Sequence, residues 1–211
     1  MLEVTTQEKI KLSFGLTALR GFENTVLPNF FCSLYSSDIE WNPNITGGSA
    51  VSLLFIPSEK DAFCNHANLV LIKRSLKVGS HKGQIGFPGG KAEPGERLAK
   101  ETVLREVEEE LGVAADKLTV HASLPPFNAL NGNPVIPFIL TADVKYTDFC
   151  LQKSEVDSCY CLPWSAFTKR KNQPFQFNLF GRWRQSDFYR CEGVDIWGLT
   201  ARIINYADID F

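Results

Sequence analysis

GKAEPGE at residues 90–96, followed by REVEEELGV at residues 105–113, is the stretch that decides the fold of this 211-residue chain. Glu106, Glu109 and Glu110 stand at positions i, i+3 and i+4, so a helix places their carboxylates on one face. Like charges at this spacing slightly destabilise a helix, which favours a role in binding a cation. Oxygen ligands suit Mg2+ or Mn2+, while a solvated acidic helix face is the simpler alternative.

The surroundings of these glutamates favour the cation site over a solvated face. Arg105 lies four residues before Glu109 and can brace its carboxylate. Residues 87–90 read FPGG, a tight turn whose glycines allow the backbone to approach a ligand closely. Gly112 suits a helix C-terminal cap. A separate apolar stripe runs along the same helix and is expected to face the core: Val103, Leu104, Val107 and Leu111.

At these residues the chain resembles a Nudix hydrolase. The family box reads G-x5-E-x7-R-E-U-x-E-E-x-G-U, where U is aliphatic, and residues 105–113 match its second half throughout. Counting from Gly90 puts Glu96 in place but leaves one extra residue before Arg105. This longer spacing resembles the coenzyme A diphosphatase branch, which carries G-G-K-x-E and T-A-L-R-E; residues 89–93 and 102–106 are similar to these motifs.

The branch also has an upstream signature, L-L-T-x-R-S-x3-R-x3-G-x3-F-P-G-G. Residues 70–75 read VLIKRS, and Gly83 and the FPGG turn follow at the expected spacing. Two positions depart from the pattern: Ile72 replaces a Thr, and Gly79 replaces an Arg that would suit a substrate phosphate. Residues 196–203, IWGLTARI, resemble the final helix of the branch.

The chemistry of a diphosphate assigns roles to the acidic residues. Its P–O–P bond is shielded by negative oxygens, so divalent ions are needed to neutralise charge and activate water. Glu106 and Glu110 are the principal expected ligands, and Glu109 is either a third ligand or the general base. Arg105 braces Glu109, so the expected catalytic residues are Glu109, Arg105 and Glu106. Two further glutamates at the mouth of the helix either bind another ion or are merely solvated: Glu93 and Glu96.

Other residues are expected to meet the substrate. Gly89 and Gly90 can present backbone N–H groups to phosphates. Arg74, with Lys73 as the weaker candidate, suits the 3′-phosphate of a coenzyme A-like ligand, because an arginine fork matches phosphate. Two further candidates carry weaker signals. Glu155, before an expected strand, is equally explained as an exposed residue at the start of that strand, and His81 is less certain still, because a lone histidine in a loop is usually solvent-exposed.

We therefore expect a hydrolase, dependent on Mg2+ or Mn2+, that cleaves coenzyme A or an acyl derivative to 3′,5′-ADP and 4′-phosphopantetheine. Because Gly79 stands where the branch signature has an arginine, another nucleoside diphosphate derivative, such as ADP-ribose or a nucleotide sugar, is the alternative substrate. A non-catalytic Nudix-like module that binds a nucleotide or a protein would be expected to lose the acidic box, which is intact here.

Composition agrees with one enzyme domain. A chain of 211 residues with 44% hydrophobic residues can bury a sizeable core, and a net charge of −2 disfavours nucleic-acid binding. The N-terminal residues lack a signal-peptide pattern, and no apolar run is long enough to span a membrane, so we expect a cytoplasmic protein without a membrane partner. The six cysteines show no zinc-ligand spacing. The sequence leaves open whether the chain forms a homodimer.

The order of elements indicates an α/β fold, and the resemblance implies a Nudix-like α/β/α sandwich with a mixed β-sheet. We expect residues 1–48 to form a helical lead-in, with its helix over 6–35, packed on a Nudix domain at 49–211. Strands are expected at residues 49–56, 68–74, 118–124, 134–142, 156–162 and 186–190, and helices at 96–111, 163–169 and 196–208. Four aromatic residues near a Pro/Gly-bearing segment are expected to pack in the core, with base stacking as the alternative: Phe175, Phe177, Phe180 and Trp183.

Overall fold

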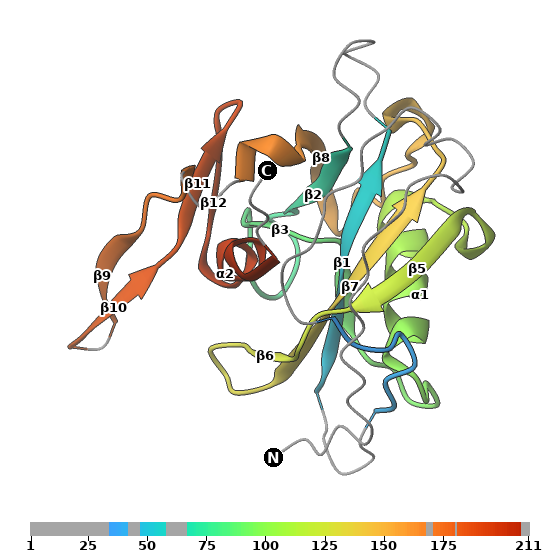
Figure 1. The fold of residues 1–211 in the computed structure, drawn as a ribbon, viewed down its shortest axis with the longest axis horizontal. Helices are drawn as coiled ribbons and strands as arrows, with labels where there is room; N and C mark the ends of the chain where they lie inside the picture. Colours follow the sequence, from blue (N-terminus) through green and yellow to red (C-terminus); the bar gives the residue numbers. More distant parts are fainter. Residues whose placement is uncertain (1–33, 42–46, 58–66, 168–170, 180, 208–211) are drawn as a thin grey trace.

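The computed structural model describes residues 34–41, 47–57, 67–167, 171–179 and 181–207. Its main element is an eight-stranded sheet whose central path runs β3-β2-β1-β7-β5, with β4, β6 and β8 pairing at its margins (Figure 1). The strands of this sheet are β1 (Ser49–Ile56), β2 (Asn68–Arg74), β3 (Ile85–Gly86), β4 (Gly89–Lys91), β5 (Leu118–Ser123), β6 (Phe127–Asn128), β7 (Pro134–Ala142) and β8 (Val156–Pro163).

Both strand directions occur in this sheet, as expected. Strand β1 pairs in parallel with β7, from Ser49 opposite Val135 to Phe55 opposite Thr141. The other pairings are antiparallel, including β1 with β4 and β2 with β8. Every residue of β7 is buried, which is usual for a strand covered on both faces.

Two helices cover opposite faces of the sheet (Figure 1). Helix α1 (Ala99–Leu111) packs its stripe of Val103, Val107 and Leu111 into one core layer, which also contains Ile72. Helix α2 (Gly198–Ala207) packs into the second layer on the other face. Residues alternate between the layers along each strand because successive side chains point to opposite faces. The α/β/α sandwich with a mixed sheet is confirmed.

The boundaries of α1 correct one expectation. The helix was expected to begin at residue 96 but begins at Ala99, because the Pro94-Gly95 turn and an isolated β-bridge at Leu98 occupy the preceding residues. Glu101 in the first turn accepts the N–H groups of Arg97 and Leu98, which would otherwise lack partners. The predicted cap is confirmed: Gly112 has φ 71°, and its N–H donates to the carbonyl of Glu108.

The second half of the chain contains elements that the sequence did not reveal. The strand expected over 186–190 is present as β11 (Phe188–Cys191), but it is one of four strands that form two hairpins. The other three are β9 (Phe175–Leu179), which pairs with β10 (Arg182–Ser186), and β12 (Val194–Trp197), which pairs with β11. Because β12 takes up Ile196 and Trp197, α2 begins later than expected. Short 3-10 helices occupy Ala115–Lys117, Tyr146–Asp148 and Trp164–Phe167, the last within the helix expected at 163–169.

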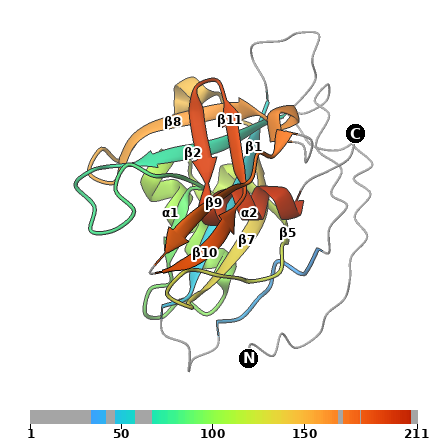
Figure 2. The same ribbon diagram turned by 90° about the vertical axis from the view of Figure 1, so that its left-hand side faces the viewer.

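The aromatic residues expected in the core lie instead on the β9–β10 hairpin. Trp183 is 70% exposed and Phe175 is 39% exposed, while Phe180 lies outside the described residues. Core packing is therefore wrong for this pair, because the hairpin stands away from the main sheet (Figures 1 and 2). Phe175 contacts the rings of Phe177 and Phe188, so part of the cluster packs against itself.

The N-terminal segment is described only from residue 34, so the helix expected over 6–35 lies almost entirely outside the described residues. Its last two positions are not helical, since Tyr35 forms a β-bridge with Ser123. Glu40 forms a second bridge, with Leu98 at the start of α1. In the described parts of the chain, no helix is long and apolar enough to cross a membrane. The four described cysteines, at positions 150, 159, 161 and 191, form no disulfide.

Candidate active site

Glu110 lies at the centre of the site, beneath the seam between α1 and β4. The residue is only 1% exposed, and its Oε2 accepts the N–H of Gly89 at 2.9 Å. Arg74 approaches the other oxygen, with Nη1 3.5 Å from Oε1. Burial raises the pKa of Glu110 to about 8, and the nearby carboxylates of Glu106 and Glu155 act in the same direction.

Gly89 and Gly90 were expected in a tight turn but lie in β4, where both pack closely against other parts of the protein; the approach of their backbone to a ligand stays a prediction. A Cβ on Gly90 would lie 2.2 Å from Oε1 of Glu106, and one on Gly89 would lie 2.3 Å from the carbonyl oxygen of Ala50. Gly89 also has φ +142°, which side-chain-bearing residues rarely adopt. The N–H of Gly89 donates to Glu110, so this glycine positions a carboxylate. Gly90 lets the Glu106 side chain of α1 lie directly against β4, and Gly89 lets β4 lie closely against β1.

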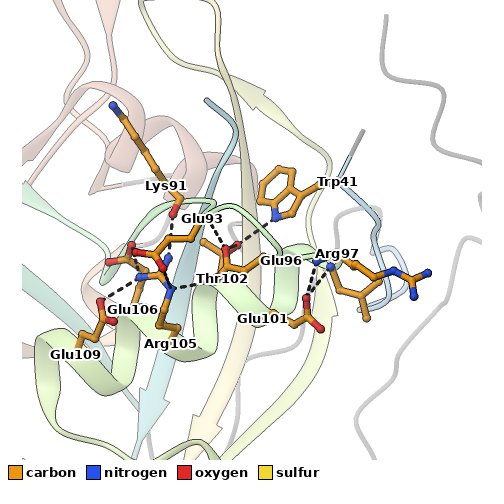
Figure 3. Close-up of polar contacts among 11 residues, drawn as sticks. Trp41, Lys91, Glu93, Glu96, Arg97, Glu101, Thr102, Arg105, Glu106 and Glu109 are labelled. Atoms are coloured by element: carbon orange, nitrogen blue, oxygen red, sulfur yellow. Dashed lines mark hydrogen bonds and ion pairs between the residues drawn. The ribbon is translucent and has the colours of Figure 1, made fainter. Parts of the chain in front are cut away.

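Arg105 organises the acidic residues on the solvent side of the seam (Figure 3). Its guanidinium donates to the carboxylates of Glu106 at 3.1 Å and Glu109 at 3.0 Å, which confirms the predicted i, i+4 brace. It also donates to the carbonyl of Lys91 and to Glu96, both at 2.9 Å. Burial opposes the charge of Arg105, but its bonds to Glu96 and Glu106 raise the pKa well above the usual value. The side chain is therefore a fixed cation.

Glu96 anchors Arg105 through a chain of hydrogen bonds that reaches the N-terminal segment. Its Oε2 accepts the hydroxyl of Thr102 at 2.6 Å, and Thr102 in turn accepts the indole N–H of Trp41 at 3.1 Å. Although burial opposes its charge, hydrogen bonds from the Thr102 hydroxyl, the Glu93 N–H and Arg105 lower the pKa of Glu96. Sequence reasoning missed Trp41 and Thr102, because no spacing signal links Thr102 to a tryptophan 61 residues away.

Glu106 and Glu109 differ in exposure although they share the acidic side of α1. The Glu106 side chain is 12% exposed and that of Glu109 is 51% exposed. Burial raises the pKa of Glu106, and the repulsion from Glu109 and Glu155 adds to it, while Arg105 opposes the shift. Glu155 therefore lies close enough to interact electrostatically with both buried carboxylates, from the loop just before β8.

The remaining predicted residues lie at the margin of the site. Lys73 pairs with Asp157 at 3.4 Å on an exposed part of β2. His81 is exposed, with φ 55°, and its Nδ1 lies 2.9 Å from the side-chain oxygen of Gln84. Glu93 is 62% exposed at the side chain and lies 3.9 Å from Arg105. The structure brings none of these three into the buried centre around Glu110.

The donor set fits a hard divalent cation. Oε1 of Glu110 is buried and has no hydrogen-bond partner, so it retains free acceptor capacity beside Glu106. Among the residues the structure describes, no three acidic or cation-ligating side chains are arranged around a common point. Arg105 holds Glu106 and Glu109, and Arg74 pairs with Glu110.

Comparison with known proteins agrees with this geometry. The NUDIX domain family matches residues 49–181. An uncharacterized Nudix hydrolase NudL from Pectobacterium atrosepticum is 31% identical over 145 residues, which cover 65% of this chain and 71% of that protein. The human mitochondrial coenzyme A diphosphatase NUDT8 is 31% identical over 144 residues, covering 67% of this chain and 61% of the relative.

Other relatives are longer than the matched region. Nudix hydrolase 22, a chloroplastic protein of Arabidopsis thaliana, is 33% identical over 142 residues, which cover 64% of this chain but only 47% of the relative. Among solved structures, a MutT/nudix family protein from Enterococcus faecalis aligns with a TM-score of 0.48 and 15% identity, covering 79% of this chain and 62% of that one.

Proposed function

This chain belongs to the Nudix hydrolase family, and on that premise we propose that it cleaves the diphosphate bond of coenzyme A or an acyl-coenzyme A. The products would be 3′,5′-ADP and 4′-phosphopantetheine or its acyl derivative. The observation that carries the hydrolase assignment is the buried Oε1 of Glu110, which lacks a hydrogen-bond partner beside a second buried carboxylate. A buried carboxyl oxygen with free acceptor capacity suits a cation site.

Mg2+ or Mn2+ would be held by Glu106 and Glu110, and Glu155 interacts electrostatically with both of these carboxylates. The bound ion would neutralise phosphate charge and lower the pKa of a water molecule. Glu109 is the proposed general base, because its carboxylate is half exposed and because it directly precedes Glu110, one of the proposed metal ligands. Arg105 fixes the orientation of Glu106 and Glu109 through hydrogen bonds to each, so the acidic side chains do not have to be ordered during the reaction.

The choice of coenzyme A rests on the sequence around the site. Residues 70–90 resemble the coenzyme A diphosphatase branch, and the human relative that carries this name is 31% identical to the chain. The guanidinium of Arg74 lies 3.5 Å from Glu110, and the side chain is 27% exposed. Arg74 can therefore contact both the acidic site and a phosphate that enters from solvent. Arg74 is therefore the proposed contact for the 3′-phosphate.

A second substrate class is favoured by one observation. Gly79, which replaces the arginine of the branch signature, has nothing within 4 Å of a would-be Cβ, so this loop offers the ligand no side chain there. A site with one phosphate-binding arginine fewer would also suit ADP-ribose or a nucleotide sugar, neither of which has a 3′-phosphate. The two proposals differ in whether that phosphate improves turnover.

A hydrolysis panel distinguishes them. The chain is incubated with Mg2+ or Mn2+ and coenzyme A, dephospho-coenzyme A, ADP-ribose or a nucleotide sugar, and the products are identified by mass. We expect coenzyme A to be the best substrate and dephospho-coenzyme A to be clearly poorer. Arg74→Ala should remove most of that difference, about 1.5–3 kcal/mol for a charged hydrogen bond.

The matched control for this substitution is Arg97→Ala, because Arg97 is exposed before the first turn of α1. It should leave the preference between coenzyme A and dephospho-coenzyme A unchanged. Equal rates on the two compounds in the unmodified protein, together with faster turnover of ADP-ribose or a nucleotide sugar, would replace the coenzyme A proposal with the second substrate class.

A further inference from the structure

The backbone aims Arg74 at the acidic site. Along β2, Val70 and Ile72 pack into the layer that contains α1, so Arg74, two residues further on, points to the same face. The pairing of β2 with β8 shifts register between Lys73 and Arg74, where the regular ladder ends. Its backbone is held in place, because its N–H donates to the carbonyl of Gln84 and its carbonyl accepts the N–H of Gly83.

The contact between Arg74 and Glu110 is an ion pair without good hydrogen bonds. Nη1 and Oε1 are 3.5 Å apart, whereas charge-assisted hydrogen bonds are about 2.7–2.9 Å long. Nε of Arg74 and Oε1 of Glu110 are both buried without a hydrogen-bond partner. Buried polar atoms in this condition are costly, so each group gains if it finds a better partner.

We propose that Arg74 exchanges partners during the reaction cycle, pairing with Glu110 in the free protein and with a phosphate of the nucleotide ligand once a cation occupies Glu110. The inference deepens the proposed function and rests on it for the cation and the ligand. A divalent ion bound to Oε1 would repel a guanidinium beside the same oxygen. The released Arg74 is partly exposed and fits an oxyanion bidentately.

The exchange makes cation and anionic ligand bind cooperatively. Occupation of Glu110 releases Arg74 for the phosphate, and capture of Arg74 by the phosphate clears Oε1 for the cation, so each ligand raises the affinity for the other. This coupling comes in addition to any direct contact between metal and phosphate. It can therefore be measured without metal, by neutralising Glu110 through substitution.

The test is a double-mutant cycle in EDTA that measures the binding of 3′,5′-ADP by calorimetry. The cycle is measured at about pH 9, so that the buried carboxyl group of Glu110 is ionised. Glu110→Gln keeps the shape of the side chain and the acceptor for Gly89 but removes the charge that holds Arg74. We expect it to bind 3′,5′-ADP roughly tenfold more tightly than the unmodified protein, the equivalent of one charge-assisted hydrogen bond. In an Arg74→Met background, the same change should give little or no gain.

The matched control is Glu109→Gln, which removes one negative charge from the adjacent residue, whose carboxylate pairs with Arg105 and not with Arg74. In one contrary result, Glu109→Gln raises the affinity for 3′,5′-ADP as much as Glu110→Gln does; in another, the effect of Glu110→Gln persists in the Arg74→Met background. Either result would show general charge repulsion and would overturn the proposed exchange of partners by Arg74. Inorganic diphosphate is the second probe. A cycle seen with diphosphate but not with 3′,5′-ADP supports the exchange and counts against coenzyme A, while no coupling with either probe overturns the exchange whatever the hydrolysis panel shows.

A measurement on the unmodified protein tests the proposal even if the Glu110→Gln variant does not fold. The Nε–H of Arg74 is buried, so in 15N-labelled protein its resonance, assigned by its loss in Arg74→Met, should be protected from solvent exchange. Addition of Mg2+ should shift this resonance and speed its exchange as the side chain leaves Glu110. An Arg74 resonance that keeps its position and protection at saturating Mg2+ contradicts the proposal.

Discussion

Glu110 shows how one side chain can be both buried and available. Gly89 satisfies its Oε2, while Oε1 is left with an ion pair at 3.5 Å and no hydrogen bond. Leaving a buried carboxylate oxygen in this state costs folding free energy, which a bound cation would offset. The position therefore combines a stability cost with a chemical purpose, as functional sites commonly do.

The first prediction follows from this residue. Glu110→Gln should lower turnover by at least ~10²-fold on the correct substrate, because an amide cannot neutralise or hold the ion that activates water. The fold should be nearly unchanged, since the amide oxygen can still accept the N–H of Gly89. Steady-state kinetics and circular dichroism check the two parts, with Glu108→Gln on the exposed side of α1 as the control. Near-normal turnover would remove Glu110 from the metal site.

At this scale the sequence predicted pairs that lie close along the chain and missed those that do not. The Arg105–Glu109 brace and the Gly112 cap depend on local helical geometry, and both are present. The bond from Trp41 to Thr102 depends on where a distant segment packs, so no local pattern contains it. The pairing of Arg74 with Glu110 was missed for the same reason, since it joins a strand to a helix.

The seam between β4 and α1 is the element that converts an acidic helix into a site. Because Gly90 lies directly against Glu106, a methyl group there has to displace either the carboxylate or the strand. We predict that Gly90→Ala lowers turnover by roughly tenfold or more through misplacement of Glu106, an effect expected when a catalytic group moves by about 1 Å. Steady-state kinetics with saturating metal provide the measurement.

Gly79→Ala is the control for that substitution, because a Cβ at Gly79 meets nothing within 4 Å. It should leave turnover close to that of the unmodified protein. If the two alanine variants behave alike, the close packing of Gly90 on Glu106 has no functional consequence.

A second prediction at the scale of elements concerns β5 and β7. Their register shifts between Val120 and Ala122, so His121 lies at a β-bulge, with its Nε2 2.8 Å from the hydroxyl of Thr141. Burial lowers the pKa of His121 below 6.5, its usual value. Protonation is then easier in the unfolded chain, so the free energy of unfolding should fall as pH decreases below about 6.5.

His121→Gln, which is neutral throughout this range, should lose less stability than the unmodified protein between about pH 7 and pH 5. Urea unfolding of both proteins in EDTA measures this difference, and any constant cost of the substitution cancels when each protein is compared with itself. Parallel loss in both proteins would show that His121 does not contribute to acid sensitivity.

For the whole molecule, the acidic site predicts a response of stability to metal. Millimolar Mg2+ or Mn2+ should bind the folded state preferentially and raise the melting temperature, by roughly 5–10 °C at a hundred times the dissociation constant. A variant with Gln at all three positions Glu106, Glu109 and Glu110 should melt no lower than the metal-free parent, because it also loses their mutual repulsion. Differential scanning calorimetry with and without metal provides the comparison. Equal shifts in parent and variant would place the ion elsewhere.

The overall architecture was predictable where the hydrophobic pattern is strong. The strands at Ser49–Ile56, Asn68–Arg74 and Pro134–Ala142 have the expected bounds, because long buried runs bounded by polar or turn residues leave little freedom. The β9–β10 hairpin was not predicted, since it is exposed and its aromatic residues resemble core residues in sequence. Burial is a property of the whole fold, and composition alone does not specify it.

The parallel pairing of β1 with β7 also constrains how the chain reaches this structure. The two strands are neighbours at the middle of the sheet, yet α1 and β5 lie between them in sequence. Contacts between distant segments form slowly because a long loop must close before they contribute. During synthesis, β1 must therefore remain without its central partner until β7 has left the ribosome, and its apolar surface is open to aggregation for that time.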